Sequence, residues 1–503
     1  MRERLDDIRL RIEKSLQEVE RENYLARAGL KTDLNSSAIY DRFPDLGSQA
    51  LVEFLRAHIE QVQASSEKGE SLRKLKLLLM SAVDISLNNQ IKDLRDQWWA
   101  IESRGMITLG EGNTTIPFSV SELAMMNELD RTRRGLIADA RAQFILRELN
   151  PIHEEISRRV WEQIRRLGYK DYVEMEEGLQ GFDLLGLHTR TEEILARTEN
   201  VYLELLTWFV KKKVGVSIQE LRSHDLAFLA RGGEFDRGFP AREVSANVFG
   251  FLQRMNLDPS AHGALQVDLD PRPGKAPGAF CFAVRVPEEV YVVINPRGGA
   301  DDYQAFLHQL GHALHLSYTS PSLDWEYKRF GDPSTSEGFA ATFDHLVLDK
   351  IWLKKVLGLD QSEEYRRHRY WTELLELRRT CAMLSYELLL HRDANLKSKA
   401  EVYSEILRSA MKVRYPREYY LADVPLAISS PYVIRGRMIE SILTQYLTEN
   451  FDEDWFLNPR TGEFFKDLWH SGQKLTAEEL ARHLAYPSLT LEFLVDKIES
   501  ALR

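Results

Sequence analysis

One short region of this chain departs from an otherwise helical pattern. Residues 279–286 and 290–294 are rich in Phe and Val, and Pro287 opens the turn that separates them. Short apolar, β-branched runs bounded by turn residues predict strands. Almost everywhere else, apolar residues recur at the three-to-four-residue spacing of amphipathic helices. We therefore expect a mainly α protein that contains one small β-sheet.

Prolines and glycines mark the expected ends of the helices. Long helical patterns cover residues 2–30, 70–103 and 363–391. Another pattern begins at Ser121, and we expect it to stop at Pro151, because proline removes a backbone donor and clashes inside a helix.

Composition narrows the classes of function. Lys and Arg number 66 and Asp and Glu number 77, which gives a net charge of −11. This acidity argues against a general surface for nucleic acid or anionic membranes. The two cysteines, Cys281 and Cys381, cannot form a disulfide framework. The charged N-terminus lacks a signal-type apolar segment, and no apolar run has the length of a membrane span. We expect a cytoplasmic protein with neither nucleic acid nor membrane as a partner.

The stretch DDYQAFLHQLGHALHLSY, residues 301–318, holds three of the 13 histidines: His308, His312 and His315. His308 and His312 are four residues apart, so on a helix they project from one face. Two such imidazoles can hold one zinc ion, which also needs a third protein ligand and an open position for water. Alternatively, they are packing or surface residues. Gly311 costs about 1 kcal/mol relative to Ala inside a helix and predicts close approach by another backbone.

A candidate third ligand is Glu337, 25 residues after His312. Alternatively, Ser334 and Glu337 form a capping box, and the glutamate only caps its helix. We interpret His315 as a buried, hydrogen-bonded residue rather than a ligand. Asp344 follows Glu337 by seven residues on the same predicted helix face and could orient a ligand from behind.

Four pieces occur in order: GKAPGAFCF, VYVVINP, AFLHQLGHALH and then Glu337. This block resembles the thimet oligopeptidase/oligoendopeptidase F family of zinc metallopeptidases (gluzincins). The resemblance implies a two-lobed helical fold with a deep central channel. Residues 1–180 would form the N-terminal helical lobe, and residues 181–503 the catalytic-type lobe with its zinc helix at 302–318. One Zn²⁺ ion would be held by His308, His312 and Glu337, although the ligand types also suit cobalt or manganese.

The resemblance also implies how a short peptide substrate would bind. The segment containing Gly278, Ala279 and Phe280 would offer backbone groups to an extended peptide at a sheet edge. Toward the C-terminus, the stretch YYLADVPLAISSPYVIRGR, residues 419–437, corresponds loosely to the family's transition-state donors. Tyr432 is the main candidate, and Tyr419, Tyr420 and Arg435 are weaker candidates. Alternatively, Tyr432 and Arg435 are structural residues.

The resemblance places the catalytic glutamate, the general base, at Gln309. A Gln side chain can hydrogen-bond a water molecule but cannot accept and return its proton. Loss of a positioned acid–base group costs about 10²–10⁴ in rate. The first hypothesis is therefore a zinc-dependent oligopeptidase, impaired at Gln309.

Two other hypotheses remain: a catalytically inactive pseudo-peptidase that binds zinc and peptide, and a helical scaffold without metal. The sequence leaves open whether Gln309 is natural or engineered, which peptides are preferred, whether cleavage is internal or terminal, and the oligomeric state.

Overall fold

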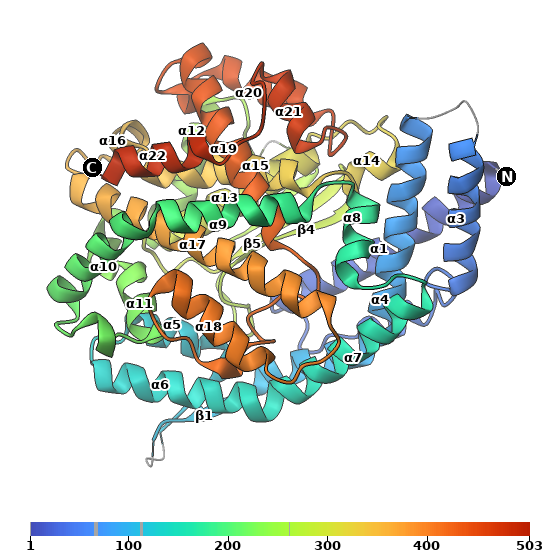
Figure 1. Ribbon diagram of the computed structural model, residues 1–503. Helices are drawn as coiled ribbons and strands as arrows, with labels where there is room; N and C mark the ends of the chain where they lie inside the picture. Colours follow the sequence, from blue (N-terminus) through green and yellow to red (C-terminus); the bar gives the residue numbers. More distant parts are fainter. Residues whose placement is uncertain (1, 65–68, 111–113, 261, 503) are drawn as a thin grey trace.

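The computed structural model describes residues 2–64, 69–110, 114–260 and 262–502, most of which are α-helical (Figure 1). The first third of the chain contains a two-stranded hairpin among eight helices. Its elements are α1 (Arg2–Arg27), α2 (Ser36–Tyr40), α3 (Gln49–Ala64), α4 (Glu70–Arg104), β1 (Met106–Thr108), β2 (Thr115–Pro117), α5 (Phe118–Asn127), α6 (Arg131–Phe144), α7 (Asn150–Arg166) and α8 (Tyr172–Gln180).

The rest of the chain packs a second, three-stranded sheet among further helices. These elements are α9 (Leu184–Arg197), α10 (Glu199–Lys213), α11 (Ser223–Arg231), α12 (Val244–Arg254), β3 (Leu265–Asp268), β4 (Ala279–Arg285), β5 (Glu289–Ile294), α13 (Ala300–Ser317), α14 (Trp325–Arg329), α15 (Pro333–Asp344), α16 (Lys350–Leu357), α17 (Glu363–Arg392), α18 (Lys399–Met411), α19 (Ser430–Phe451), α20 (Pro459–Trp469), α21 (Ala477–His483) and α22 (Glu492–Leu502). The predicted fold class, mainly α with a small sheet beside the histidine helix, is confirmed. The division at residue 180 stays a prediction.

The three-stranded sheet has the order β3-β5-β4. Strand β5 pairs in parallel with β3 and antiparallel with β4, so β4 lies at an edge. β4 also contacts α1 and α13. The two strands expected from the sequence are both present. β3 was not predicted, because its four residues are too short to show a strand pattern.

Two helical boundaries differ from the sequence prediction. The pattern that begins at Ser121 breaks after Asn127, and α6 starts anew with Asp130 as its cap. Pro151 does not stop a helix, because α6, the π-helical segment Ile145–Leu149 and α7 follow one another without a break, and Pro151 lies just after the π-helical segment. Prolines and π-helical segments are both places where a continuous helix departs from its regular hydrogen bonding.

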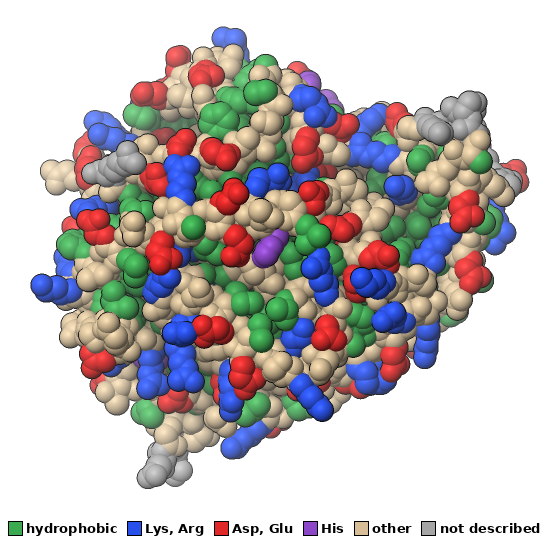
Figure 2. Space-filling view, in the orientation of Figure 1, with side chains coloured by type: hydrophobic (Ala, Val, Ile, Leu, Met, Phe, Trp, Pro, Cys, Tyr) green, Lys and Arg blue, Asp and Glu red, His purple; other side chains and the backbone are tan. Residues whose placement is uncertain are grey.

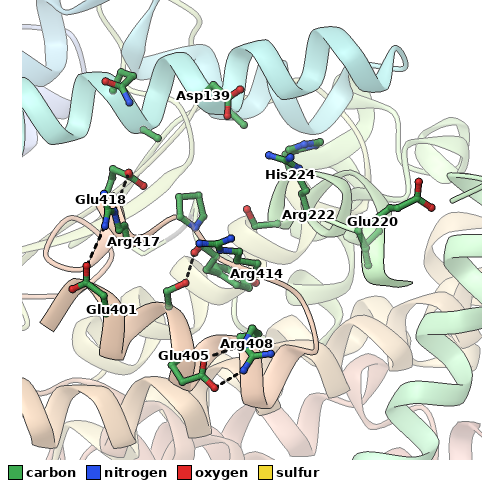
Figure 3. A pocket seen from close by; sticks show the side chains of 18 of the residues that line it. Asp139, Glu220, Arg222, His224, Glu401, Glu405, Arg408, Arg414, Arg417 and Glu418 are labelled. Carbon is green, nitrogen blue, oxygen red and sulfur yellow. Dashed lines mark hydrogen bonds and ion pairs between the residues drawn. The ribbon is translucent and has the colours of Figure 1, made fainter. Parts of the chain in front are cut away.

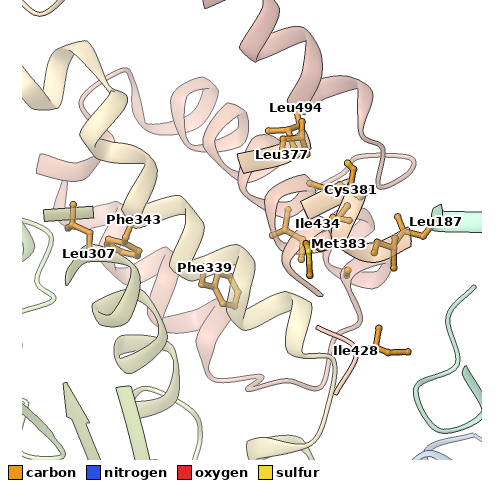
Figure 4. Close-up of a cluster of buried hydrophobic side chains, with 14 of the residues drawn as sticks. Leu187, Leu307, Phe339, Phe343, Leu377, Cys381, Met383, Ile428, Ile434 and Leu494 are labelled. Carbon is orange, nitrogen blue, oxygen red and sulfur yellow. The ribbon is translucent and has the colours of Figure 1, made fainter. Parts of the chain in front are cut away.

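Helices α13, α15 and α19 pack unusually closely. A Cβ atom added to Gly311 would lie 2.6 Å from the Cα atom of Ala340, so only glycine permits this crossing of α13 and α15. The expected close backbone approach at Gly311 is confirmed. On α19, a Cβ atom at Gly436 would lie 2.5 Å from the Cβ atom of Glu337. The apolar sides of these helices meet α17 and α22 in the buried cluster shown in Figure 4.

Acidic and basic side chains are interspersed over the face shown in Figure 2. Within the described part of the chain, no helix is both long and apolar enough to span a membrane.

Candidate metal centre

Three potential metal ligands converge where α13 crosses α15. The Nε2 atoms of His308 and His312 are 3.2 Å apart. The Glu337 carboxylate lies 3.8 Å from the Nε2 atom of His308 and 3.7 Å from that of His312. One donor atom from each of the three residues lies within 4.8 Å of the other two. The crossing of α13 and α15 at Gly311 thus brings together ligands that are distant in the sequence.

Each histidine uses its other ring nitrogen for a second contact. The Nδ1 atom of His308 lies 2.8 Å from Oδ2 of Asp344, and the Nδ1 atom of His312 lies 2.9 Å from Oγ of Ser336. A carboxylate can only accept, so His308 carries its proton on Nδ1, and the serine oxygen permits the same tautomer for His312. Both Nε2 atoms then present lone pairs to each other and to the Glu337 carboxylate.

This donor set fits a zinc ion. Two nitrogens at the usual distance from a tetrahedral Zn²⁺ lie about 3.3–3.4 Å apart, close to the Nε2 separation observed. When both Nε2 atoms and the carboxylate are unprotonated, these three electron-pair donors repel one another, and a cation between them would remove the repulsion. The contact from Asp344 to His308 is the carboxylate–histidine arrangement that orients metal-binding imidazoles.

A buried charge network supports the centre from behind. The Oδ1 atom of Asp344 accepts a hydrogen bond from Arg437 at 3.0 Å. Burial tends to raise the pKa of Asp344, but the charges of Arg437 and His308 outweigh it and lower that pKa. Burial tends to lower the pKa of His308, yet the hydrogen bond and charge of Asp344 raise it. Asp344 therefore remains an anion that fixes the ring of His308.

Burial is the main cause of the pKa shifts of the other two groups of the centre, His312 and Glu337. Desolvation lowers the pKa of His312 well below its usual value, with His308 as a further cause. Desolvation raises the pKa of Glu337, and the nearby His308 opposes that shift. A neutral imidazole is the form that binds metal, so burial keeps His312 ready as a ligand at neutral pH.

The capping interpretation of Glu337 is wrong. Helix α15 begins at Pro333, and Asp332 is its N-cap, with its side chain accepting from the Ser334 N–H at 2.9 Å. Glu337 lies two positions beyond the one from which a glutamate completes a capping box. Its carboxylate is free to face the histidines.

His315 and Gln309 take different places around the centre. His315 is fully buried, and its Nδ1 atom lies 3.1 Å from Oγ of Ser336. Burial lowers the pKa of His315 to about 4. This matches the interpretation of a buried, hydrogen-bonded residue. Gln309 follows His308 directly on α13 and is partly exposed.

The Tyr432 hydroxyl is engaged by a carboxylate that is not one of the three ligands. Tyr432 and Gly436 are one turn apart on the face of α19 that packs on Glu337. The Tyr432 hydroxyl donates to Oε1 of Glu176 on α8, and its ring packs edge-on against Phe182. The structure thus ties the predicted donor to a carboxylate.

Arg435 is held in a separate network. Its guanidinium donates to Asp332 Oδ2 at 2.6 Å and to Ser334 Oγ at 3.1 Å, both at the start of α15. Arg435 is buried and links α19 to α15.

The contacts of the other predicted substrate-binding residues involve groups other than the three ligands. The Tyr420 hydroxyl donates to Glu154 of α7 at 2.7 Å, and Tyr419 packs against a separate apolar cluster that includes Phe118. Gly278 precedes the edge strand β4, which begins with Ala279 and Phe280 and packs on α13. Their role in peptide binding stays a prediction.

Three residues of this neighbourhood were not predicted: Ser336, Arg437 and Glu176. Ser336 precedes Glu337, and Arg437 ends the stretch already singled out on α19. Position next to a candidate residue is therefore the only signal that could have found them. Nothing in the sequence points to Glu176, whose contact with Tyr432 joins residues 256 apart.

Fold and site together define a helical scaffold that brings two histidines and a glutamate to one point. Solved structures share this fold. A protein described as an oligoendopeptidase F, from Bacillus anthracis strain Ames, is 15% identical and superposes with a TM-score of 0.59 over 92% of this chain and 84% of its own. Another described as oligoendopeptidase F is 14% identical, with a TM-score of 0.67 over 99% and 96%. PZ peptidase A with an inhibitor is 17% identical, with a TM-score of 0.67 over 100% and 97%. No family model and no curated protein matches the sequence.

Proposed function

We propose that this chain is a zinc-dependent metallopeptidase of the oligopeptidase type, acting on short peptides and impaired by Gln309. The convergence of one potential ligand atom from each of His308, His312 and Glu337, all within 4.8 Å of one another, carries this proposal. The shared fold with oligoendopeptidases supports the peptide as substrate class.

Each residue of the proposed site would have a separate role. His308, His312 and Glu337 would hold one Zn²⁺ ion, which when bound polarises a peptide carbonyl and lowers the pKa of its water. Asp344 orients His308 and keeps its proton on Nδ1. The amide of Gln309 can position water by hydrogen bonding but cannot carry a proton to the leaving amine. The edge strand β4 would align an extended peptide beside α13.

The test is restoration of the base. The Gln309→Glu variant, loaded with zinc, should cleave a mixed fluorogenic peptide library about 10²–10⁴ times faster than the unmodified chain. Metal content is measured in parallel by elemental analysis. Zinc bound at one ion per chain, together with cleavage by the variant, supports the proposal.

A double variant provides the matched control. Gln309→Glu combined with His312→Ala restores the base but removes a ligand, so it should show neither stoichiometric zinc nor cleavage. Equal cleavage by the single and double variants would point to a contaminating peptidase. Zinc binding without any cleavage by Gln309→Glu would reject the peptidase proposal.

One observation favours the second candidate, a catalytically inactive pseudo-peptidase that binds zinc and peptide. The Tyr432 hydroxyl is engaged by Glu176, so the predicted transition-state donor already has an acceptor of its own. On this alternative, peptide binds but restoration of the base has no effect.

A further inference from the structure

The largest cavity among the described residues has a volume of about 1300 Å³ and is not lined by any of the three metal ligands. It lies between α6, α11, α18 and the segment that follows α18 (Figure 3). Arginines and carboxylates both line it, and a backbone bridge between Arg222 and Arg414 joins two of its walls. Because its charges are mixed, the cavity indicates no particular ligand. The contacts behind His308 are more specific, because they form a closed network.

This network of hydrogen bonds and ion pairs connects four helices. The Nδ1 atom of His308 on α13 lies 2.8 Å from Oδ2 of Asp344 on α15. Oδ1 of Asp344 accepts from Nη1 of Arg437 on α19 at 3.0 Å. The same nitrogen of Arg437 lies 3.7 Å from Oε2 of Glu373 on α17. The other oxygen of Glu373, Oε1, accepts from Nε2 of Gln304 at 3.4 Å. Gln304 belongs to α13, so the network returns to the helix on which it began.

The return to α13 attaches Glu373 to the ligand helix at two points. Gln304 and His308 are four residues apart, so they project from one face of α13, about one turn apart. Glu373 therefore holds α13 directly through Gln304, and it reaches His308 through Arg437 and Asp344. The closed ring fixes the His308 side chain relative to the helix that carries it.

Burial makes the contacts of this ring sensitive to the loss of one member. Glu373 is 8% exposed and Asp344 is 2% exposed. In such surroundings charges are screened little, and a charge that loses its partner is costly. The guanidinium of Arg437 is a rigid, planar group that faces both carboxylates. Without Glu373, Asp344 alone would hold Arg437, and both side chains would be less fixed.

From these contacts, we propose that Glu373 is a positioning residue for the metal centre. Among the described residues, it makes no hydrogen bond or ion pair with the three ligands, so it acts on His308 through Arg437 and Asp344. The inference rests on the proposed function for the presence of a metal, but not for the cleavage of peptides.

The test measures zinc affinity rather than turnover, by competition with a chromogenic chelator. Glu373→Gln keeps the shape of the side chain and an acceptor for Gln304, but it removes the charge that faces Arg437. We expect this variant to bind zinc about tenfold more weakly than the parent. Added to Asp344→Asn, the same substitution should change the affinity by less than about twofold, because the path to His308 is already broken.

Glu376→Gln is the matched control. Glu376 lies on the same helix and lines the same small cavity as Glu373 and Arg437, but its carboxylate makes no hydrogen bond or ion pair within the described part of the chain. This variant should keep the parent affinity within about twofold. Gln304→Met tests the attachment to α13 independently, should Glu373→Gln fail to fold, and we expect at least about threefold weaker binding.

Equal affinities of Glu373→Gln and Glu376→Gln would overturn the proposal. So would independent, additive losses in the Glu373→Gln/Asp344→Asn chain, because they would show that Glu373 does not act through Asp344. A parent chain that binds no zinc would remove both this inference and the proposed function. A parent that binds zinc but gives no peptide cleavage after Gln309→Glu would reject the proposed function alone.

Discussion

Helix α19 contacts its surroundings differently at its first turn and one turn later. At Gly436 and Arg437 it supports the metal centre, because Gly436 packs on Glu337 and Arg437 binds Asp344. At Tyr432 the polar group instead contacts Glu176, far from the ligands in sequence. The groups expected to hold a metal are therefore pre-arranged, whereas the group expected to stabilise the reaction is tied to a neighbour. In the proposed enzyme, metal binding and catalysis would therefore be separable.

The close packing on the metal side is tested most severely at Gly311. Gly311→Ala places a methyl group 2.6 Å from the Cα atom of Ala340. Overpacking of this kind should lower the free energy of unfolding by about 3 kcal/mol and weaken zinc binding, because α13 and α15 must separate. Chemical denaturation and metal titration measure the two effects.

Gly250 in α12 is the matched control, because no atom lies within 4 Å of an added Cβ there. Gly250→Ala should be neutral or stabilising by up to about 1 kcal/mol. Similar losses at Gly311 and Gly250 would show that the crossing of α13 and α15 is not as tight as described.

The support from Asp344 should show in metal affinity. Asp344→Asn keeps the size of the side chain but removes the charge that fixes the proton of His308 on Nδ1. Loss of such a partner should weaken zinc binding by about 10–100-fold. Competition with a chromogenic chelator measures the constant, and Asp139→Asn, which changes a carboxylate away from the centre, is the control. An unchanged constant would mean that Asp344 only pairs with Arg437.

The contact between Tyr432 and Glu176 should be visible in the pH dependence of the free energy of unfolding. Burial raises the pKa of Glu176 to about 7, although the hydrogen bond from Tyr432 opposes this shift. The folded chain therefore holds a proton on Glu176 that the unfolded chain releases at a lower pH. Between the ordinary glutamate pKa and about 7, this group makes the free energy of unfolding fall as pH rises.

Glu176→Gln removes that titration and still accepts from Tyr432. The variant should gain roughly 3 kcal/mol over the parent at pH 8 and nothing at pH 4. Denaturation at both pH values measures the difference, and a constant offset would show that Glu176 does not change its protonation on folding.

Sequence patterns correctly predicted the features that depend on neighbouring residues in the chain. The strands β4 and β5 follow from runs of Phe and Val, and the two histidines follow from their spacing. Glu337 was placed beside them only through the family resemblance, because local sequence allowed a capping role equally well. Asp332, one residue before Pro333, decides that question structurally by capping α15 itself.

What escaped prediction depends on contacts between distant segments. The partner of Tyr432 lies on α8, and the neighbouring arginines Arg222 and Arg414 come together only through a single bridge. The strand β3 is short, and Pro151 lies inside a continuous helical run rather than at a helix end. Neither hydrophobic period nor residue spacing carries information about such tertiary pairings.

The smallest expected effect is the one that decides what Tyr432 does. Tyr432→Phe removes one hydrogen bond to Glu176 and should cost about 1 kcal/mol of stability if the residue is only structural. In the Gln309→Glu background, a structural Tyr432 leaves cleavage of the peptide library unchanged once folding is matched. If the hydroxyl instead leaves Glu176 to stabilise the reaction, the rate should fall about 10²-fold or more while KM stays constant. Glu176→Gln keeps the hydrogen-bond acceptor of Tyr432, so it separates the two cases. If Tyr432 is only structural, this variant should leave kcat unchanged. If the Tyr432 hydroxyl stabilises the reaction, the variant should shift the pH profile of kcat.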